Sequence, residues 1–198
     1  VILFSRNGKE RFNQMNMTKK LLSGALSAAL LVGVLSGCSK EPAADDVAYK
    51  ATGIARDTVI ATVNGQKIPA EDYLFWLQQS ITNVKYYGYL TSEDWSTEQI
   101  EDQTATDYVK SDALSAVTYY AVIAQKAKEN GITLTDEDKA AAEQELADME
   151  SSLAEQNITL QMMLDAQCMS RDGFLAMNEK YYLSQNLHEA FYEGGPLD

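Results

Sequence analysis

The setting of Cys38 points to a covalent processing event early in the chain. From Met17, a basic pair, Lys19 and Lys20, precedes the fifteen uncharged residues Leu21–Leu35, and two small residues then lead to Cys38. A positive segment, an apolar segment and a small-residue cleavage site in this order are typical of a secretory signal peptide. Fifteen helical residues span about 22 Å, short of the roughly 30 Å hydrocarbon core of a bilayer. The sequence therefore predicts cleavage before Cys38 rather than a transmembrane helix.

The residues Leu35-Ser36-Gly37-Cys38 closely resemble a bacterial lipobox. The resemblance implies that the Cys38 sulfur is lipidated, that the chain is cut before it and that the new N-terminus is usually acylated as well. Residues 1–37 are then an upstream extension and signal peptide, with the true start at Met15, at Met17 or upstream. Two acyl chains give stable membrane anchoring, whereas one gives only marginal binding.

The charge of the predicted mature chain excludes some partners. Residues 1–37 hold five of the 16 basic side chains and one of the 29 acidic ones, so residues 38–198 carry a formal charge of −17. Nucleic acid requires a basic face, and anionic lipid attracts basic segments rather than acidic ones. We therefore expect no nucleic-acid partner, and the lipid on Cys38 must supply the membrane attachment.

The rest of the sequence predicts a mostly α domain with one short N-terminal β-hairpin. Residues 38–57 hold Cys38 and a polar run without periodicity, which predicts a flexible tether. Residues 58–193 form the predicted helical domain, and residues 194–198 serve as a linker or C-terminus. Asn64-Gly65 between two short apolar runs indicates a hairpin with a type I′ turn over Thr58–Pro69. The predicted helices are Ala70–Tyr87, with an apolar stripe of Tyr73, Leu77, Ile81 and Val84, and Ala105–Asn130, which ends before Gly131. A helix to about Glu155 follows Thr135–Asp138, which resembles a capping box with Asp in place of the usual Glu or Gln. Thr159 caps a short helix through Met169, and the last helix is capped by Ser170 or Asp172 and ends at Gly194-Gly195-Pro196.

Groups that could do catalysis are scarce. The single histidine, His188, is expected on a polar helix side, and Cys168 is expected to be a structural cysteine whose apolar setting raises the thiol pKa. The chain has neither the ligand spacing of a zinc site nor a glycine-rich phosphate-binding motif. We therefore expect no catalytic residue, no metal, no nucleotide and no cofactor.

Aromatic and methionine side chains are abundant instead, with 11 Tyr and 7 Met. Met adapts its shape to different apolar partners, and Tyr offers a large contact area at low entropic cost. Such side chains fill a core, and as a group they also suit a groove for unfolded chains. The candidate contacts for an unfolded chain are Tyr73, Trp76, Tyr86, Tyr87, Tyr119 and Phe191.

Three passages resemble the N-terminal chaperone domain of PrsA/SurA-type extracytoplasmic foldases: Ile60–Tyr73 with its Val-Asn-Gly turn, Gly131–Asp138 and Asn157–Leu160. Together with the lipobox, the resemblance covers roughly residues 58–193. It implies a lipid-anchored chaperone of the bacterial cell envelope that binds unfolded or nascent secreted polypeptides without ATP.

Fuller members of that family continue into a parvulin domain, whose paired histidines are absent here. One alternative is therefore the N-terminal fragment of a peptidyl-prolyl cis-trans isomerase, an enzyme only if a parvulin domain follows. The other alternative is a solute-binding lipoprotein.

Overall fold

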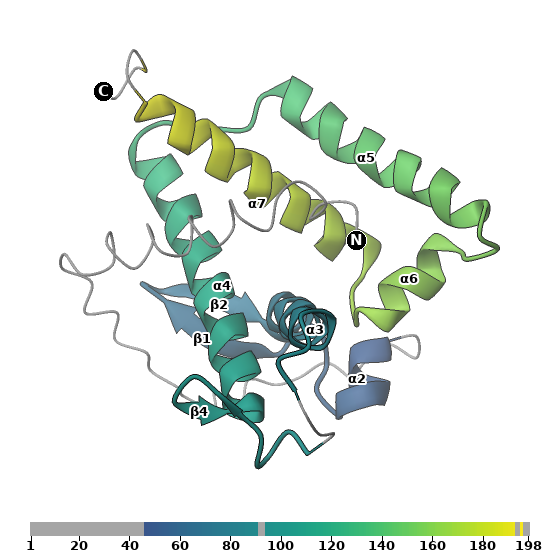
Figure 1. Cartoon of the computed structure of the whole chain (residues 1–198). Coiled ribbons are helices and arrows are strands. Elements are labelled where there is room, and N and C mark those ends of the chain that lie inside the picture. Colours follow the sequence, from purple (N-terminus) through teal and green to yellow (C-terminus); the bar gives the residue numbers. More distant parts are fainter. Residues whose placement is uncertain (1–45, 91–93, 193–194, 196–198) are drawn as a thin grey trace. The chain divides into compact units, whose positions relative to one another are not determined.

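The computed structural model describes residues 46–90, 94–192 and 195, and these are mostly helical, as the sequence predicts (Figure 1). Cys38 and the lipobox lie outside the described residues. Within the described part, no helix is both long and apolar enough to cross a membrane. The helices and strands are α2 (Val47–Thr52), β1 (Val59–Val63), β2 (Gln66–Pro69), α3 (Ala70–Tyr86), β3 (Gln99–Ile100), β4 (Gln103–Thr104), α4 (Ala105–Glu129), α5 (Asp136–Ala154), α6 (Leu160–Ala166) and α7 (Arg171–Ala190).

The predicted hairpin is confirmed. Strands β1 and β2 pair antiparallel, with Val63 opposite Gln66, and both turn residues have positive φ, 49° at Asn64 and 84° at Gly65. These are the signs that a type I′ turn requires. The hairpin is held to α4 because Gln125 Nε2 donates to the Val63 carbonyl at 2.8 Å.

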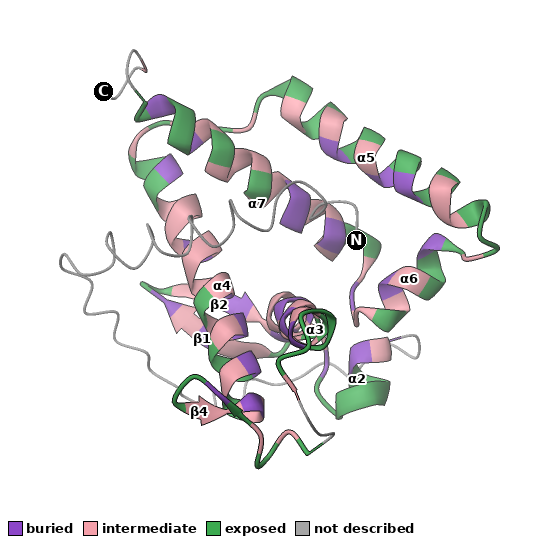
Figure 2. Cartoon of the chain, viewed as in Figure 1, coloured by how far each residue is buried: buried purple, intermediate pink, exposed green. Residues whose placement is uncertain are grey.

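Helices α3 and α4 begin and end within a residue of their predicted bounds. Of the predicted stripe on α3, Val84 is buried, Leu77 and Ile81 are half-buried and pack against the core around Val84, and Tyr73 is half-buried. The helix also buries Ala70, Phe75, Trp76 and Ser80 (Figure 2). It packs mainly against α4. The acidic connection before α4 also contains a second small hairpin, β3–β4, which the sequence did not predict.

Four helices, α3, α4, α5 and α6, end with the same pair of hydrogen bonds around a left-handed residue. At the end of α4, Gly131 donates to the Lys128 carbonyl at 3.2 Å and Ile132 to the Ala127 carbonyl at 2.8 Å. This pair of bonds is a Schellman motif, so Gly131 occupies the position that the sequence predicted. The equivalent left-handed residues after α3, α5 and α6 are Gly88, Asn157 and Cys168.

The N-terminus of α7 is held by a carboxylate from α3. Glu71 Oε1 accepts the backbone N–H of Ser170, the residue that caps α7. A Cβ atom added at Gly173 would lie 2.5 Å from the Glu71 carboxyl carbon, so only glycine leaves room for this carboxylate. Next to it, Lys180 Nζ on α7 forms an ion pair with Asp72 Oδ2 of α3 at 2.5 Å, and both side chains are mostly buried.

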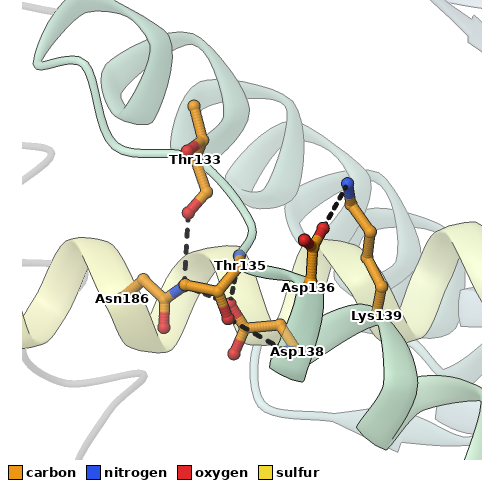
Figure 3. A network of polar contacts seen from close by, with 6 residues as sticks. All are labelled: Thr133, Thr135, Asp136, Asp138, Lys139 and Asn186. Carbon is orange, nitrogen blue, oxygen red and sulfur yellow. Dashed lines mark hydrogen bonds and ion pairs between the residues drawn. The ribbon is translucent and has the colours of Figure 1, made fainter.

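A polar network joins the start of α5 to α7 (Figure 3). Thr135 and Asp138 form the predicted capping box: the Thr135 hydroxyl accepts the Asp138 N–H at 3.0 Å, and Asp138 Oδ2 accepts the Thr135 N–H at 2.7 Å. The same carboxylate accepts Asn186 Nδ2 of α7 at 2.8 Å. Hydrogen bonds from the Thr135 backbone and then from Asn186 lower the pKa of Asp138.

Three predicted boundaries are wrong. Within the predicted tether, residues 46–57 are folded and include α2. The buried Asp46 caps this helix by accepting the Tyr49 N–H, and its second oxygen accepts the Arg56 N–H, each at 3.0 Å. At the other end, α7 stops at Ala190, before the glycine pair expected to end it. The short helix α6 likewise ends at Ala166, before Met169.

A double-mutant cycle tests the joint between Glu71 and Gly173. Glu71→Ala is expected to cost about 1–3 kcal/mol of unfolding free energy, because a charge-assisted hydrogen bond is lost. Gly173→Ala should be neutral or destabilising in the native chain, since the methyl group displaces the carboxylate. In the Glu71→Ala background it should stabilise by about 0.5–1 kcal/mol, the usual gain for replacing glycine in a helix. Urea unfolding followed by circular dichroism measures the unfolding free energy of all four chains. If the effects of the two substitutions add within about 0.3 kcal/mol, the contact between Glu71 and the start of α7 is contradicted.

A second prediction concerns Asp138 and pH. Asp138→Ala should cost about 1 kcal/mol at neutral pH, because the capping box is lost. The folded-state pKa of Asp138 lies below its unfolded value. Its contribution is therefore complete above the unfolded pKa of about 3.9 and is lost as the pH falls through the lower folded value. Denaturant unfolding at a series of pH values measures the difference.

The control is Asp136→Ala, which removes a fully exposed carboxylate from the same helical turn. Its effect should stay within a few tenths of a kcal/mol. A cost for Asp138→Ala that persists unchanged at strongly acidic pH would contradict the assignment.

Candidate polypeptide-binding surface

The structure does not bring the six candidate contact residues together. Tyr86, Tyr87 and Phe191 are exposed, Tyr73 and Tyr119 are half-buried, and Trp76 is buried. The exposed residues lie at the C-terminal ends of two different helices, α3 and α7 (Figure 2). The six residues therefore divide into core and surface groups rather than lining one groove.

Trp76 belongs to the core. Only 8% of its surface is exposed, its ring stacks on Tyr120 with centroids 5.3 Å apart, and it meets Phe75 edge-to-face at 5.2 Å. The hollow beside it, lined in part by Asp72 and Lys180, measures about 10 Å³. That is room for roughly one water molecule, so this hollow does not suit a solute.

The two half-buried tyrosines contribute to packing between helices. The Tyr119 hydroxyl on α4 lies 3.2 Å from the Ser184 hydroxyl on α7 and forms a hydrogen bond with it. Burial raises the pKa of Tyr73, so its phenol stays neutral at physiological pH. Each of them offers only part of its ring to a ligand.

Three exposed tyrosines gather at the end of α3, and we call Tyr86, Tyr87 and Tyr89 the tyrosine patch. Their exposed fractions are 81%, 56% and 49%. The rings of Tyr86 and Tyr87 meet edge-to-face with centroids 5.1 Å apart, and those of Tyr87 and Tyr89 lie 6.0 Å apart. Gly88 turns the chain at φ 65°, and the Tyr89 N–H then returns to the Val84 carbonyl at 3.2 Å. The turn thus places Tyr89 beside Tyr87.

Sequence reasoning missed Tyr89, although a signal for it was present. The segment Tyr86-Tyr87-Gly88-Tyr89 places a glycine directly after the last helical residues. Glycine at this position commonly takes the left-handed conformation that reverses the chain. The pattern therefore indicated that the third tyrosine would lie next to the first two.

A small separate core supports the tyrosine patch. It is formed by the end of α3, the β3–β4 hairpin and the start of α4, whose buried residues include Val84, Ile100 and Val109. Trp95 and Tyr108 pack against it, and Lys85 Nζ lies 5.8 Å from the centre of the Trp95 ring. Val84 and Leu90, which flank the patch in the sequence, therefore belong to a packed region.

A second exposed aromatic pair lies at the end of α7. Phe191 and Tyr192 are each more than half exposed, and the His188 ring meets Tyr192 with centroids 4.4 Å apart. His188 is itself exposed, as the sequence predicted. This pair is smaller than the tyrosine patch.

Cys168 is half-buried in the turn after α6. Burial, followed by the charges of Asp46 and Asp165, raises the pKa of Cys168. The thiol is therefore protonated and weakly reactive at neutral pH, as the sequence predicted. In the part of the chain that the structure describes, no group of three or more His, Cys, Asp or Glu side chains is placed to hold a metal ion.

Comparisons with known proteins gave no match: no family model fits the chain, and neither a curated protein nor a solved structure is significantly similar to it. The likeness to PrsA/SurA-type foldases remains a hypothesis that rests on the motifs in residues 58–193.

Proposed function

We propose that this chain is a lipid-anchored chaperone of the bacterial cell envelope that binds unfolded secreted polypeptides without ATP. The observation that carries the proposal is the tyrosine patch, three neighbouring aromatic rings that are about half or more exposed. Aromatic side chains are the usual anchors of protein–protein contacts, because they bury much surface at little entropic cost. Exposed aromatic groups of this kind mark interaction sites.

The mechanism is mass action. An unfolded chain that rests one apolar or aromatic segment on the patch is withdrawn from the pool that aggregates. Because the rings are exposed on the surface, a bound segment can dissociate readily. Binding would be weak, reversible and tolerant of sequence, which suits a protein that receives many different clients.

The proposed lipid anchor on Cys38 lies shortly before the described part of the chain, which begins at Asp46. If Cys38 is lipidated, the residues between it and Asp46 link the folded part to the membrane. The eight Cα-to-Cα steps from Cys38 to Asp46 span at most about 29 Å when fully extended. The folded part would therefore work close to the membrane surface, where secreted chains emerge.

An aggregation assay tests the chaperone activity. The processed chain in phosphatidylcholine nanodiscs, added at a few molar equivalents, should slow the light scattering of a reduced, unfolded secretory protein. Tyr86→Ser/Tyr87→Ser/Tyr89→Ser should remove most of this effect, because the exposed anchors are gone. The proposal is contradicted if empty nanodiscs slow the scattering as well as the loaded ones do. It is also contradicted if the triple variant slows the scattering as well as the native chain does.

The matched control is Tyr49→Ser/Tyr181→Ser, which removes exposed tyrosines from α2 and α7 and should leave the suppression intact. A proline-isomerisation assay on the same samples tests the isomerase alternative. Activity there would assign enzymatic function to this part of the chain.

Lipidation has its own test. The Cys38→Ala variant, expressed in a bacterium with lipoprotein processing, should be found in the aqueous phase rather than the detergent phase in a detergent partitioning assay, because no acyl chain is attached. Cys168→Ala is the control and should partition as the native chain does. Mass spectrometry of the native N-terminal peptide should show an acylated Cys38, and an unmodified cysteine there would refute the anchor.

A further inference from the structure

We infer that the tyrosine patch selects basic segments of unfolded polypeptides, in which lysine or arginine stands next to apolar residues. The inference rests on the proposed function, because it names the class of client segment that this surface would take. It is carried by the acidic side chains that lie around the patch.

Carboxylates dominate the elements beneath the patch. In the described residues from the end of α3 through the first turns of α4, only Lys85 and Lys110 are basic, whereas the acidic residues are Asp94, Glu98, Glu101, Asp102, Asp107 and Asp112. Lys85 already lies over the Trp95 ring. A bound cationic side chain would therefore meet more negative than positive charge here.

The patch and the acidic segments border the same small core. Val84 and Leu90, which flank the patch in the sequence, pack in one cluster with Tyr108. Burial raises the pKa of the Tyr108 phenol, and the charges of Asp112 and Glu101 raise it further. These two carboxylates therefore act on the core that flanks the patch.

The chemistry of the patch suits a cation in three ways. The face of a tyrosine ring attracts an ammonium or guanidinium group within about 6 Å of its centre. The carboxylates add direct attraction and steer a charged segment toward the surface. The patch also lies at the C-terminal end of α3, where the helix dipole places partial negative charge.

Other occupants fit the charge less well. The whole chain has a formal charge of −13, so an anionic lipid surface or a second copy of the chain would be repelled. An acidic unfolded segment would meet the same repulsion. An unfolded segment that combines apolar and basic side chains is the occupant that this surface fits.

Binding of two matched peptides tests the inference. Both peptides carry the same apolar residues, one with Lys and Arg between them and the other with Glu and Asp at the same positions. Their fluorescence anisotropy is measured with the processed chain in phosphatidylcholine nanodiscs, with empty nanodiscs as the blank. The basic peptide should bind about tenfold or more tightly than the acidic one. The preference should shrink as the salt concentration rises from roughly 0.05 M to roughly 0.5 M.

Two sets of variants separate the parts of the surface. Tyr86→Ser/Tyr87→Ser/Tyr89→Ser should weaken binding of the basic peptide about tenfold or more. Glu101→Gln/Asp112→Asn should reduce the preference for the basic peptide about fivefold while leaving the rings in place. Tyr49→Ser/Tyr181→Ser should bind both peptides as the native chain does, and thermal unfolding confirms that each variant is folded.

Equal binding of the two peptides, no binding of either, or a preference that survives both sets of variants overturns the inference. The aggregation assay reports separately on the proposed function. Suppression of aggregation without a preference for the basic peptide leaves the chaperone activity and refutes the selectivity. A preference without suppression supports the basic-segment site and refutes the chaperone activity.

Discussion

The position of α7 depends on carboxylates at the start of α3 as well as on packing. Glu71 on α3 accepts the N–H of Ser170 at the head of α7, and the neighbouring Asp72 pairs with Lys180 further along α7. Helix α7 packs mainly against α4, and helices α5 and α6 make their main contacts with α7 and with each other. The second half of the described chain is therefore attached through α7, by its packing on α4 and by these two contacts to α3. A helix N-terminus carries unpaired N–H groups and partial positive charge, so an acceptor with a negative charge is well suited to hold it.

The contacts of Glu71 and Asp72 with α7 explain why the short stretch from Asn64 to Asp72 carries so much structural information. Between Asn64 and Asp72 the chain makes a tight turn, closes a two-stranded sheet, begins α3 after Pro69 and presents both carboxylates to α7. Each of these steps demands a particular residue type. A stretch with such constraints is recognisable as a motif whether or not the proteins that share it share a function. Its resemblance to the foldase motif is therefore evidence about local structure first.

Local chemistry was readable from the sequence, and distant contacts were not. The Asn64-Gly65 turn, the Thr135 capping box and the caps at Thr159 and Ser170 each depend on residues within a few positions, and each was predicted correctly. Helix α2 depends on Asp46 reaching Arg56, and the α7 joint spans 99 positions, so neither was visible. Phe75 and Trp76 lie off the predicted stripe of α3, and the Trp76 ring stacks on Tyr120 of α4, a contact that no local pattern shows. Of the candidate contact residues, Tyr86 and Tyr87 are exposed and Trp76 is buried, and the exposed Tyr89 was not among them.

The two ends of α3 have different surroundings, and this separates groups that stabilise the fold from the proposed binding surface. At the N-terminal end Glu71 and Asp72 are engaged with α7, so their loss would weaken the fold. At the C-terminal end the tyrosines of the patch are exposed to solvent. Exposed residues away from caps and cores usually change stability by no more than about 0.5 kcal/mol. The aromatic surface can therefore change with little consequence for folding, which is the freedom that a surface selected for binding requires.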